Sequence, residues 1–406
     1  MNTQLTRRIF IQSSTIAALT GLTLQKKARG QEDTQMQDFY VYVGTYTSKT
    51  SKGIHVYRLD MNSGELTPDH IVTGITNPSY LAISPQRNFL YSVSEVSDSQ
   101  GKPTGSVSAF AIDSSNGNLR RLNHVSSEGA SPCYVSVDST GRWVLVANYS
   151  SGTIAVLPVQ EDGSLGNASD IKKHTGSSVN PKRQKQAYAH CIIPSPDNRY
   201  IFAADLGTDK VMIYKFDAEN GTLTENDPPF AQVKPGAGPR HFTFHPTGKL
   251  AFLIQELNST LTSFAYDPSQ GTLTEIQTVS TLPKSFTGEN TCADVHVHPN
   301  GKFVYGSNRG HDSIAIFALD EASGNMEFIG HESTQGRIPR NFAIDPTGTY
   351  LFAANQNTDN IVGFQIDPES GKLTPTGHSV KVSMPVCIRM MPVSANVSSI
   401  HSTGEL

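Results

Sequence analysis

Cysteine is scarce in this chain of 406 residues, which contains only four: Cys133, Cys191, Cys292 and Cys387. They lie far apart and form neither a CxxC pair nor a Cys/His cluster with the spacing of zinc ligands. The sequence therefore predicts no structural metal. Because the four fall in different repeats of the pattern described below, we interpret them as small buried residues rather than as a disulfide framework.

Long apolar runs are absent after the first thirty residues, so we expect the mature protein to be soluble and not inserted in a membrane. The first thirty residues are different. Arg7 and Arg8 precede Phe10 and the apolar run SSTIAALTGLTL, and no acidic residue occurs before Glu32. This order is typical of an export signal and is similar to a twin-arginine signal, which directs folded proteins across a bacterial membrane.

The small residues Ala28 and Gly30 offer a cleavage site before Gln31. The alternative is an uncleaved N-terminal anchor, for which the apolar core is short. We therefore predict an export signal over residues 1–30, a linker over 31–37 and an extracytoplasmic, periplasmic location in a bacterium.

An excess of basic residues is also absent. The formal net charge of the whole chain is -4, and it becomes -9 without residues 1–30, which contain five Lys and Arg and no Asp or Glu. An acidic surface does not suit nucleic acid or an anionic membrane, so neither is an expected partner. A basic pocket in such a protein would be a local feature of the fold.

Helical periodicity is absent, and a short turn recurs instead. Gly-x-Leu, once with Met in place of Leu, occurs at Gly64-Glu65-Leu66, Gly117-Asn118-Leu119, Gly163-Ser164-Leu165, Gly221-Thr222-Leu223, Gly271-Thr272-Leu273, Gly324-Asn325-Met326 and Gly371-Lys372-Leu373. These seven copies are 46 to 58 residues apart, about the length of a four-stranded propeller blade, and alternating strand-like segments lie between them. We therefore predict an all-β, seven-bladed β-propeller of antiparallel blades over residues 38–393, whose Gly-x-Leu turns open the fourth strands, and a disordered tail over 394–406.

The two ends of this pattern complement each other. The first repeat begins directly with the second-strand segment FYVYVGTY (39–46) and so lacks an inner strand, whereas the spare strand VCIRMMP (386–392) follows the seventh turn. We predict that the C-terminal strand completes the first blade and closes the ring, which removes an open sheet edge. Truncation at about Ser383 should then cost most of the fold.

Two positions in each repeat are candidates for a functional site. The entrance of the inner strand carries Ser79, Cys133, His190, Arg240, Ala293, Arg340 and Val386, and the end of the second strand carries Tyr46, Glu95, Tyr149, Leu206, Glu256, Arg309 and Gln356. Because adjacent strands of a blade are antiparallel, both sets should ring the same mouth of the central channel. A channel mouth is polar in any case, so residue types must decide whether this ring is functional.

The residue types favour acid/base chemistry on an anionic or polar small molecule. His190 could be a general acid or base because imidazole titrates near neutral pH. Glu256 could hold a water molecule or accept a proton, or it could form a plain salt bridge to Arg240 or Arg309. Those two arginines could bind an anion or stabilise an oxyanion.

The remaining candidates would bind the substrate: Arg309 itself, Arg340, Glu95, Tyr149 and Gln356. His241 and His311 are neighbours of ring positions and could instead face into the sheet. No GxSxG elbow is present, which disfavours a covalent acyl-enzyme, and no metal or organic cofactor is expected.

The chain resembles the family of seven-bladed propeller lactonases, which includes bacterial 6-phosphogluconolactonases and fungal carboxymuconate lactonising enzymes. The resemblance covers roughly residues 38 to 393 and is most specific at VYVGTYT (41–47), VANYSSGTIAVLPV (146–159), AADLGTDKV (203–211), GAGPRHFTFHPTGK (236–249) and SNRGHDSIAIF (307–317). It implies that His190 is the acid/base histidine and that Arg240, Glu256 and Arg309 belong to the same site. The His-x-His common in the family reads Tyr188-Ala189-His190 here.

These observations predict a monomeric enzyme that hydrolyses a sugar lactone, as a 6-phosphogluconolactonase does, with the small-molecule lactone as its partner. His190 or Glu256 would activate water and the other would protonate the leaving alcohol. A first alternative is a lactonising cycloisomerisation of a muconate in the same site. A second is a non-catalytic exported propeller that binds a carbohydrate or a protein.

Overall fold

The computed structural model describes residues 38–98, 101 and 104–393. The predicted export signal over 1–30, the linker over 31–37 and the tail over 394–406 lie outside the described residues. Within them the protein consists of strands and turns, and no helix is present. No segment of this part has the length and apolar character of a membrane-spanning helix.

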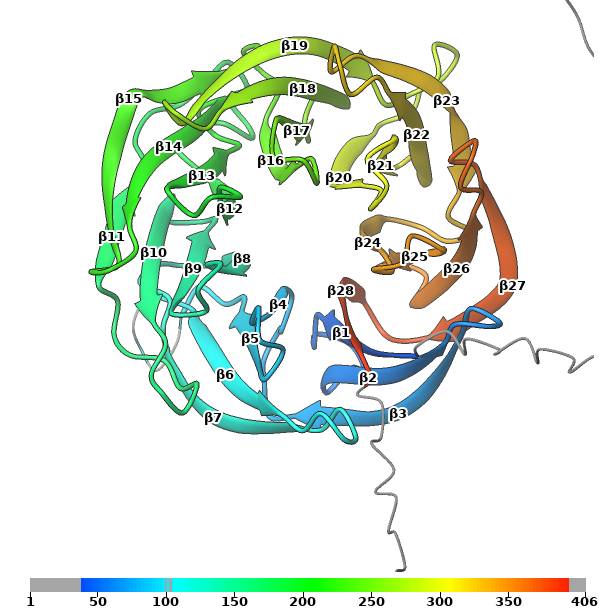
Figure 1. Ribbon diagram of the computed structural model, residues 1–406, viewed down its shortest axis with the longest axis horizontal. Coiled ribbons are helices and arrows are strands. Elements are labelled where there is room, and N and C mark those ends of the chain that lie inside the picture. Colours follow the sequence, from blue (N-terminus) through cyan, green and yellow to red (C-terminus); the bar gives the residue numbers. More distant parts are fainter. Residues whose placement is uncertain (1–37, 99–100, 102–103, 394–406) are drawn as a thin grey trace, which may run out of the picture. The chain divides into compact units, whose positions relative to one another are not determined.

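The strands form seven four-stranded antiparallel sheets arranged in a ring, which confirms the predicted β-propeller (Figure 1). In order from the channel outward, the strands of blades 1 to 3 are β28 (Pro385–Pro392), β1 (Phe39–Thr45), β2 (Gly53–Asp60) and β3 (Glu65–Thr73); β4 (Leu81–Ile83), β5 (Phe89–Ser94), β6 (Ser106–Ile112) and β7 (Leu119–Ser126); β8 (Pro132–Val137), β9 (Trp143–Asn148), β10 (Thr153–Pro158) and β11 (Asp170–Lys173).

Blades 4 to 7 follow the same order. Their strands are β12 (Ala189–Pro194), β13 (Tyr200–Asp205), β14 (Lys210–Asp217) and β15 (Thr222–Gln232); β16 (Pro239–Phe244), β17 (Leu250–Gln255), β18 (Thr260–Asp267) and β19 (Thr272–Ser280); β20 (Thr291–Val297), β21 (Phe303–Arg309), β22 (Ser313–Leu319) and β23 (Met326–Ser333); β24 (Pro339–Ile344), β25 (Tyr350–Asn355), β26 (Asn360–Ile366) and β27 (Leu373–Lys381).

The ring closes as the sequence predicts. The C-terminal strand β28 pairs antiparallel with β1, from Phe39 opposite Pro392 to Val43 opposite Ile388, and becomes the inner strand of blade 1. Figure 1 shows the two strands side by side, one from each end of the chain. Because β28 supplies one of the four strands of its sheet, blade 1 is incomplete without it.

The recurring Gly-x-Leu turn has a packing explanation. All seven glycines have positive φ, and each lies against a large side chain of the preceding blade. A Cβ on Gly221 would lie 2.1 Å from the ring of Trp143, and one on Gly64 would lie 2.6 Å from Tyr350 across the closure. Only glycine fits such a turn, since it allows both the left-handed backbone and the close approach.

One copy of the turn departs from the prediction that it opens the outermost strand. Leu165 forms only an isolated bridge with Val159, and the outer strand β11 begins five residues later at Asp170. β11 has four residues where most outer strands have eight or nine. Blade 3 therefore has a short outer edge beside the long segment that leads into blade 4.

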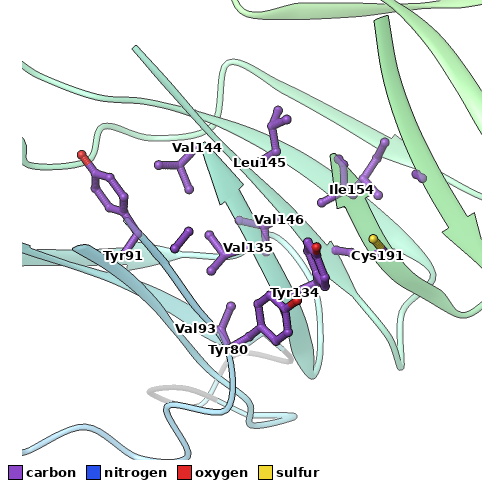
Figure 2. Packing of buried hydrophobic residues seen from close by; sticks show 14 of the residues in the cluster. Tyr80, Tyr91, Val93, Tyr134, Val135, Val144, Leu145, Val146, Ile154 and Cys191 are labelled. Atoms are coloured by element: carbon purple, nitrogen blue, oxygen red, sulfur yellow. The ribbon is translucent and has the colours of Figure 1, made fainter. Parts of the chain in front are cut away.

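The core fills the spaces between neighbouring blades. Figure 2 shows part of it, where Tyr80 beside β4 lies against Tyr134 of β8 with ring centroids 4.1 Å apart. Burying such side chains stabilises each blade against its neighbours by about 1.5–3 kcal/mol per large apolar side chain. The four cysteines are free and buried, as predicted.

Candidate active site

The first set of ring residues lies at a repeated irregularity of the inner strands. The pairing of inner and second strands skips one residue at Cys133, His190, Arg240, Arg340 and Val386. A β-bulge of this kind bends the strand and re-aims the extra side chain. The bulges explain why one position in each of these five blades directs its side chain to the channel mouth.

Six residues of the second set directly follow the second strands, and Arg309 is the last residue of β21, so this set lies at the ends of these strands as predicted. The backbone N–H groups of Glu95, Tyr149, Glu256 and Gln356 each donate to a carbonyl of the segment before the inner strand of the same blade. These bonds hold the second set beside the first. Together the two sets surround a cavity of about 270 Å³, lined by Glu95, Cys133, Tyr149, Arg183, His190, Glu256, Thr291, Arg309 and Arg340.

Glu256 is the centre of the charge arrangement. Its Oε2 accepts from Arg240 Nε at 3.0 Å and from Arg309 at 2.8 Å, and its Oε1 accepts from Arg183. Burial alone would raise the pKa of this carboxyl, but the arginines hold it well below its usual range. Glu256 is therefore an ionised counter-ion and a poor proton acceptor.

Arg240 lies beneath the cavity rather than in its lining. It is 1% exposed, and its NH1 donates to the carbonyl of Ala293 and to His241 Nε2, the latter at 3.1 Å. An arginine can only donate, so His241 must carry its proton on Nδ1, which lies 2.6 Å from Asp294 Oδ1. Burial lowers the pKa of His241 to about 3, which keeps this imidazole neutral.

His190 is a neutral imidazole that faces the cavity. It is 4% exposed, and its ring meets the rings of Tyr149 and His241 edge-on, with centroids 5.3 Å and 5.5 Å away. Burial, followed by the positive charge of Arg240, holds the pKa of His190 well below its usual value. The imidazole can therefore accept a proton at neutral pH.

Glu95 and Arg340 form the other wall of the cavity. Oε2 of Glu95 accepts hydrogen bonds from the hydroxyls of Ser79 and Tyr46, the latter at 2.9 Å. The guanidinium of Arg340 lies over the ring of Tyr46, 5.6 Å from its centroid. Neighbouring side chains at the channel mouth therefore hold both charged groups, and Glu95 and Arg340 do not hold each other.

Most predicted site residues gather at this one cavity. His190, Glu256, Arg309, Arg340, Glu95 and Tyr149 line it, and Arg240 supports it from below. Gln356 is half-buried in the ring and does not line the cavity, and His311 packs against His331 and Phe286 instead. His241 does not line the cavity, and it accepts a hydrogen bond from Arg240 NH1.

Sequence reasoning missed two groups. Arg183 comes from the segment between β11 and β12, which has no counterpart in the repeat, and its only signal is the basic run Lys182-Arg183-Gln184-Lys185. Asp294 follows Ala293 in the bulge of blade 6, where two residues instead of one are skipped. In the part of the chain that the structure describes, no three His, Cys, Asp or Glu side chains are grouped to hold a metal ion.

Comparison with known proteins identifies close relatives of the whole propeller. A family model described as a lactonase with a seven-bladed β-propeller matches residues 40–390. A Bacillus subtilis protein named 6-phosphogluconolactonase is 42% identical over 356 residues, 88% of this chain and 99% of that protein. One of the same name from Formosa agariphila is 36% identical, over 75% of this chain and 86% of its own length. The solved structure of a Pseudomonas aeruginosa periplasmic gluconolactonase is 36% identical with a TM-score of 0.83, and covers 88% of this chain and 100% of that one.

Proposed function

The chain belongs to the family of seven-bladed β-propeller lactonases, and from this premise we propose that the cavity at the channel mouth hydrolyses a sugar lactone. One observation carries the proposal. A buried neutral imidazole, His190, faces the same cavity as arginines whose positions are held by Glu256. That arrangement offers a proton acceptor and positive charge at the place where a lactone carbonyl would become an oxyanion.

In the proposed reaction His190 accepts a proton from water as the water oxygen forms a bond to the lactone carbonyl carbon. The negative charge that develops on the carbonyl oxygen lies within reach of Arg309, which lines the cavity. The ring C–O bond then breaks, and the imidazolium of His190 returns its proton to the leaving alkoxide. The product is an open-chain hydroxy acid, and Glu256 stays ionised throughout as the counter-ion of the arginines.

The relatives support hydrolysis rather than the alternatives. Those described above are named for lactone hydrolysis, which does not favour a cycloisomerase or a non-catalytic binding protein. One of them is a periplasmic gluconolactonase by name, and this supports our further proposal that residues 1–30 export this chain.

Turnover of glucono-δ-lactone and its 6-phosphate tests the proposal, with acid release followed in a pH-stat and the spontaneous rate subtracted. We expect His190→Asn to lower kcat by about 10²- to 10⁴-fold, the usual contribution of a positioned acid/base group. His124→Asn changes an exposed histidine and should leave the rate unaltered. A His190→Asn variant as active as the unaltered protein would remove the proposed base.

A further inference from the structure

Asp294 is a buried charge that the proposed reaction does not use. It is the second of the two residues that the bulge in β20 skips, it is 2% exposed, and it does not line the cavity. Burial alone would raise the pKa of this carboxyl, but its contacts with His296 and His241 hold it well below its usual range. An ionised carboxylate is costly to bury, so its hydrogen-bond partners indicate its role.

Both oxygens of Asp294 are engaged. Oδ1 accepts from His241 Nδ1 at 2.6 Å and from the backbone N–H of Val295 at 3.1 Å. Oδ2 accepts from His296 Nε2 at 3.0 Å and from the side-chain amide of Asn341. These four donors hold the carboxylate in one orientation.

The contacts of Asp294 join the inner strands of neighbouring blades. His241 lies on β16 of blade 5, Asp294 on β20 of blade 6 and Asn341 on β24 of blade 7. Asn341 is fully buried, and its Oδ1 accepts from the backbone N–H of Ile388 in the closing strand β28 at 2.8 Å. One chain of hydrogen bonds therefore runs across four blades, from His241 to the strand that closes the ring.

The carboxylate decides which nitrogen of His241 carries the proton. Asp294 can only accept, so the proton lies on Nδ1 and leaves Nε2 free to accept from Arg240 NH1 at 3.1 Å. A proton on Nε2 would instead point at NH1, which is itself a donor. The arrangement keeps Arg240 in the position where its Nε donates to Glu256 at 3.0 Å and its charge lies near His190.

We propose that Asp294 is a positioning residue for lactone hydrolysis, which fixes the tautomer of His241 and through it holds Arg240 against Glu256. This inference rests on the proposed function and adds a residue to the same reaction. The side chain of Asp294 contacts none of the residues that line the cavity. Its loss should therefore lower kcat more than it raises KM.

Asp294→Asn tests the inference in the enzyme that turns over glucono-δ-lactone or its 6-phosphate. The new amide keeps one oxygen for His241, but its NH2 group then faces the NH2 group of Asn341. We expect kcat to fall by about 10- to 100-fold, which corresponds to the loss of a hydrogen bond to a charged group, and KM to change by less than about threefold.

An exchange of the two side chains provides the rescue. In the double variant Asp294→Asn/Asn341→Asp, the amide introduced at position 294 can donate to the carboxylate introduced at position 341, while its oxygen still accepts from His241. The new carboxylate can also accept from the backbone N–H of Ile388, as Asn341 does. The double variant should recover kcat to within about threefold of the unaltered protein, which a general loss of stability at either position would not allow.

Asp345 offers a matched control. It is a second fully buried aspartate, directly after β24, and it accepts from the backbone N–H groups of Thr347 at 2.8 Å and Tyr350 at 2.6 Å. Asp345→Asn should lower Tm and leave kcat within about twofold. A loss of kcat as large as that in Asp294→Asn would overturn the inference, because it would assign the effect to lost stability.

The tautomer of His241 can be measured in the unaltered protein. With ¹⁵N-labelled histidine, its NMR signals, assigned by their absence in His241→Asn, should show the proton on Nδ1; a proton on Nε2 would overturn the inference. Unchanged kcat in Asp294→Asn would also overturn it, as would a folded double variant whose kcat stays tenfold or more below that of the unaltered protein. If the unaltered protein hydrolyses neither lactone, the proposed function fails, a result distinct from these.

Discussion

Replacing Glu256 with glutamine tests whether this side chain is a counter-ion or a base. The substitution keeps the shape of the side chain and removes the charge that Arg240 and Arg309 share at 3.0 Å and 2.8 Å. Both arginines are buried, so their charges would remain without a carboxylate partner. Arg183 is half-exposed and would be compensated by water, so it adds little to the loss.

Removal of one partner from a buried ion pair costs about 3–5 kcal/mol. With an unfolding entropy of about 2.1 cal/mol/K per residue, or about 0.7 kcal/mol/K for the propeller, this predicts that Tm falls by about 4–7 °C. Thermal unfolding followed by circular dichroism at pH 7 measures the shift. Glu275→Gln is the matched control, since Glu275 is exposed and should change Tm by less than about 1 °C.

The destabilisation has a defined pH dependence. The pKa of Glu256 is lower in the folded protein than its ordinary value of 4.5, so its ionised form stabilises the fold above that pH, and this stabilisation is lost as the pH falls through the folded pKa. The Tm difference between the two proteins should therefore be constant from pH 5 to 8 and shrink only below about pH 4.5. In activity, the variant should keep the acid limb that we assign to the proposed base, His190.

Two results would refute this reasoning. An unchanged Tm at pH 7 would mean that the arginines do not depend on Glu256. Loss of the acid limb in Glu256→Gln, together with its retention in His190→Asn, would make Glu256 the base.

Three further predictions concern the base, the closure and the repeat. Because burial and Arg240 depress the pKa of His190, kcat/KM should be flat from about pH 6.5 to 8 and fall only in more acidic solution; a midpoint at or above 6.5, the ordinary histidine value, would contradict this. Truncation after Ser383 removes β28 and opens blade 1, so no cooperative thermal transition should remain, whereas an unaltered Tm would show that closure is dispensable. Gly221→Ala should destabilise by about 2–4 kcal/mol, because it adds a clash with Trp143 to the cost of positive φ, while Gly74→Ala, with open space around it, should cost about 1–2 kcal/mol in urea unfolding.

The fold could be predicted because the contact between neighbouring blades requires a sequence pattern that can be recognised, the Gly-x-Leu turn. Each Gly-x-Leu glycine lies against a large side chain of the preceding blade, so the contact needs glycine once per blade. The number of turns therefore equals the number of blades. The exception at Gly163, where β11 starts later, could not be foreseen, because the turn itself is unchanged and only the chain after it is longer.

The site could be predicted only as far as the repeat extends. The bulge places one residue of most inner strands at the mouth, so alignment of the repeats identifies His190 and Arg340 without a structure. Arg183 lies in a segment outside the repeat, and Asp294 is the second residue of a bulge that is longer in blade 6. Their roles come from contacts between segments distant in sequence, for which neither position carries a periodic signal.

Burial and the positive charge of Arg240 favour release of a proton from His190 over uptake of one. Arg240 and the neutral His241 lie beside an imidazole whose low pKa makes it a weak base but, once protonated, a strong acid. In the proposed attack of water on the lactone carbonyl, the oxyanion forms as His190 gains its proton. The new negative charge stabilises the imidazolium. When the ring opens, that negative charge passes to the leaving ring oxygen, and the acidic imidazolium protonates it, which gives the open-chain hydroxy acid. A site with Glu256 ionised and His190 neutral at rest suits the hydrolysis proposed above, because the imidazolium that forms can protonate the departing ring oxygen.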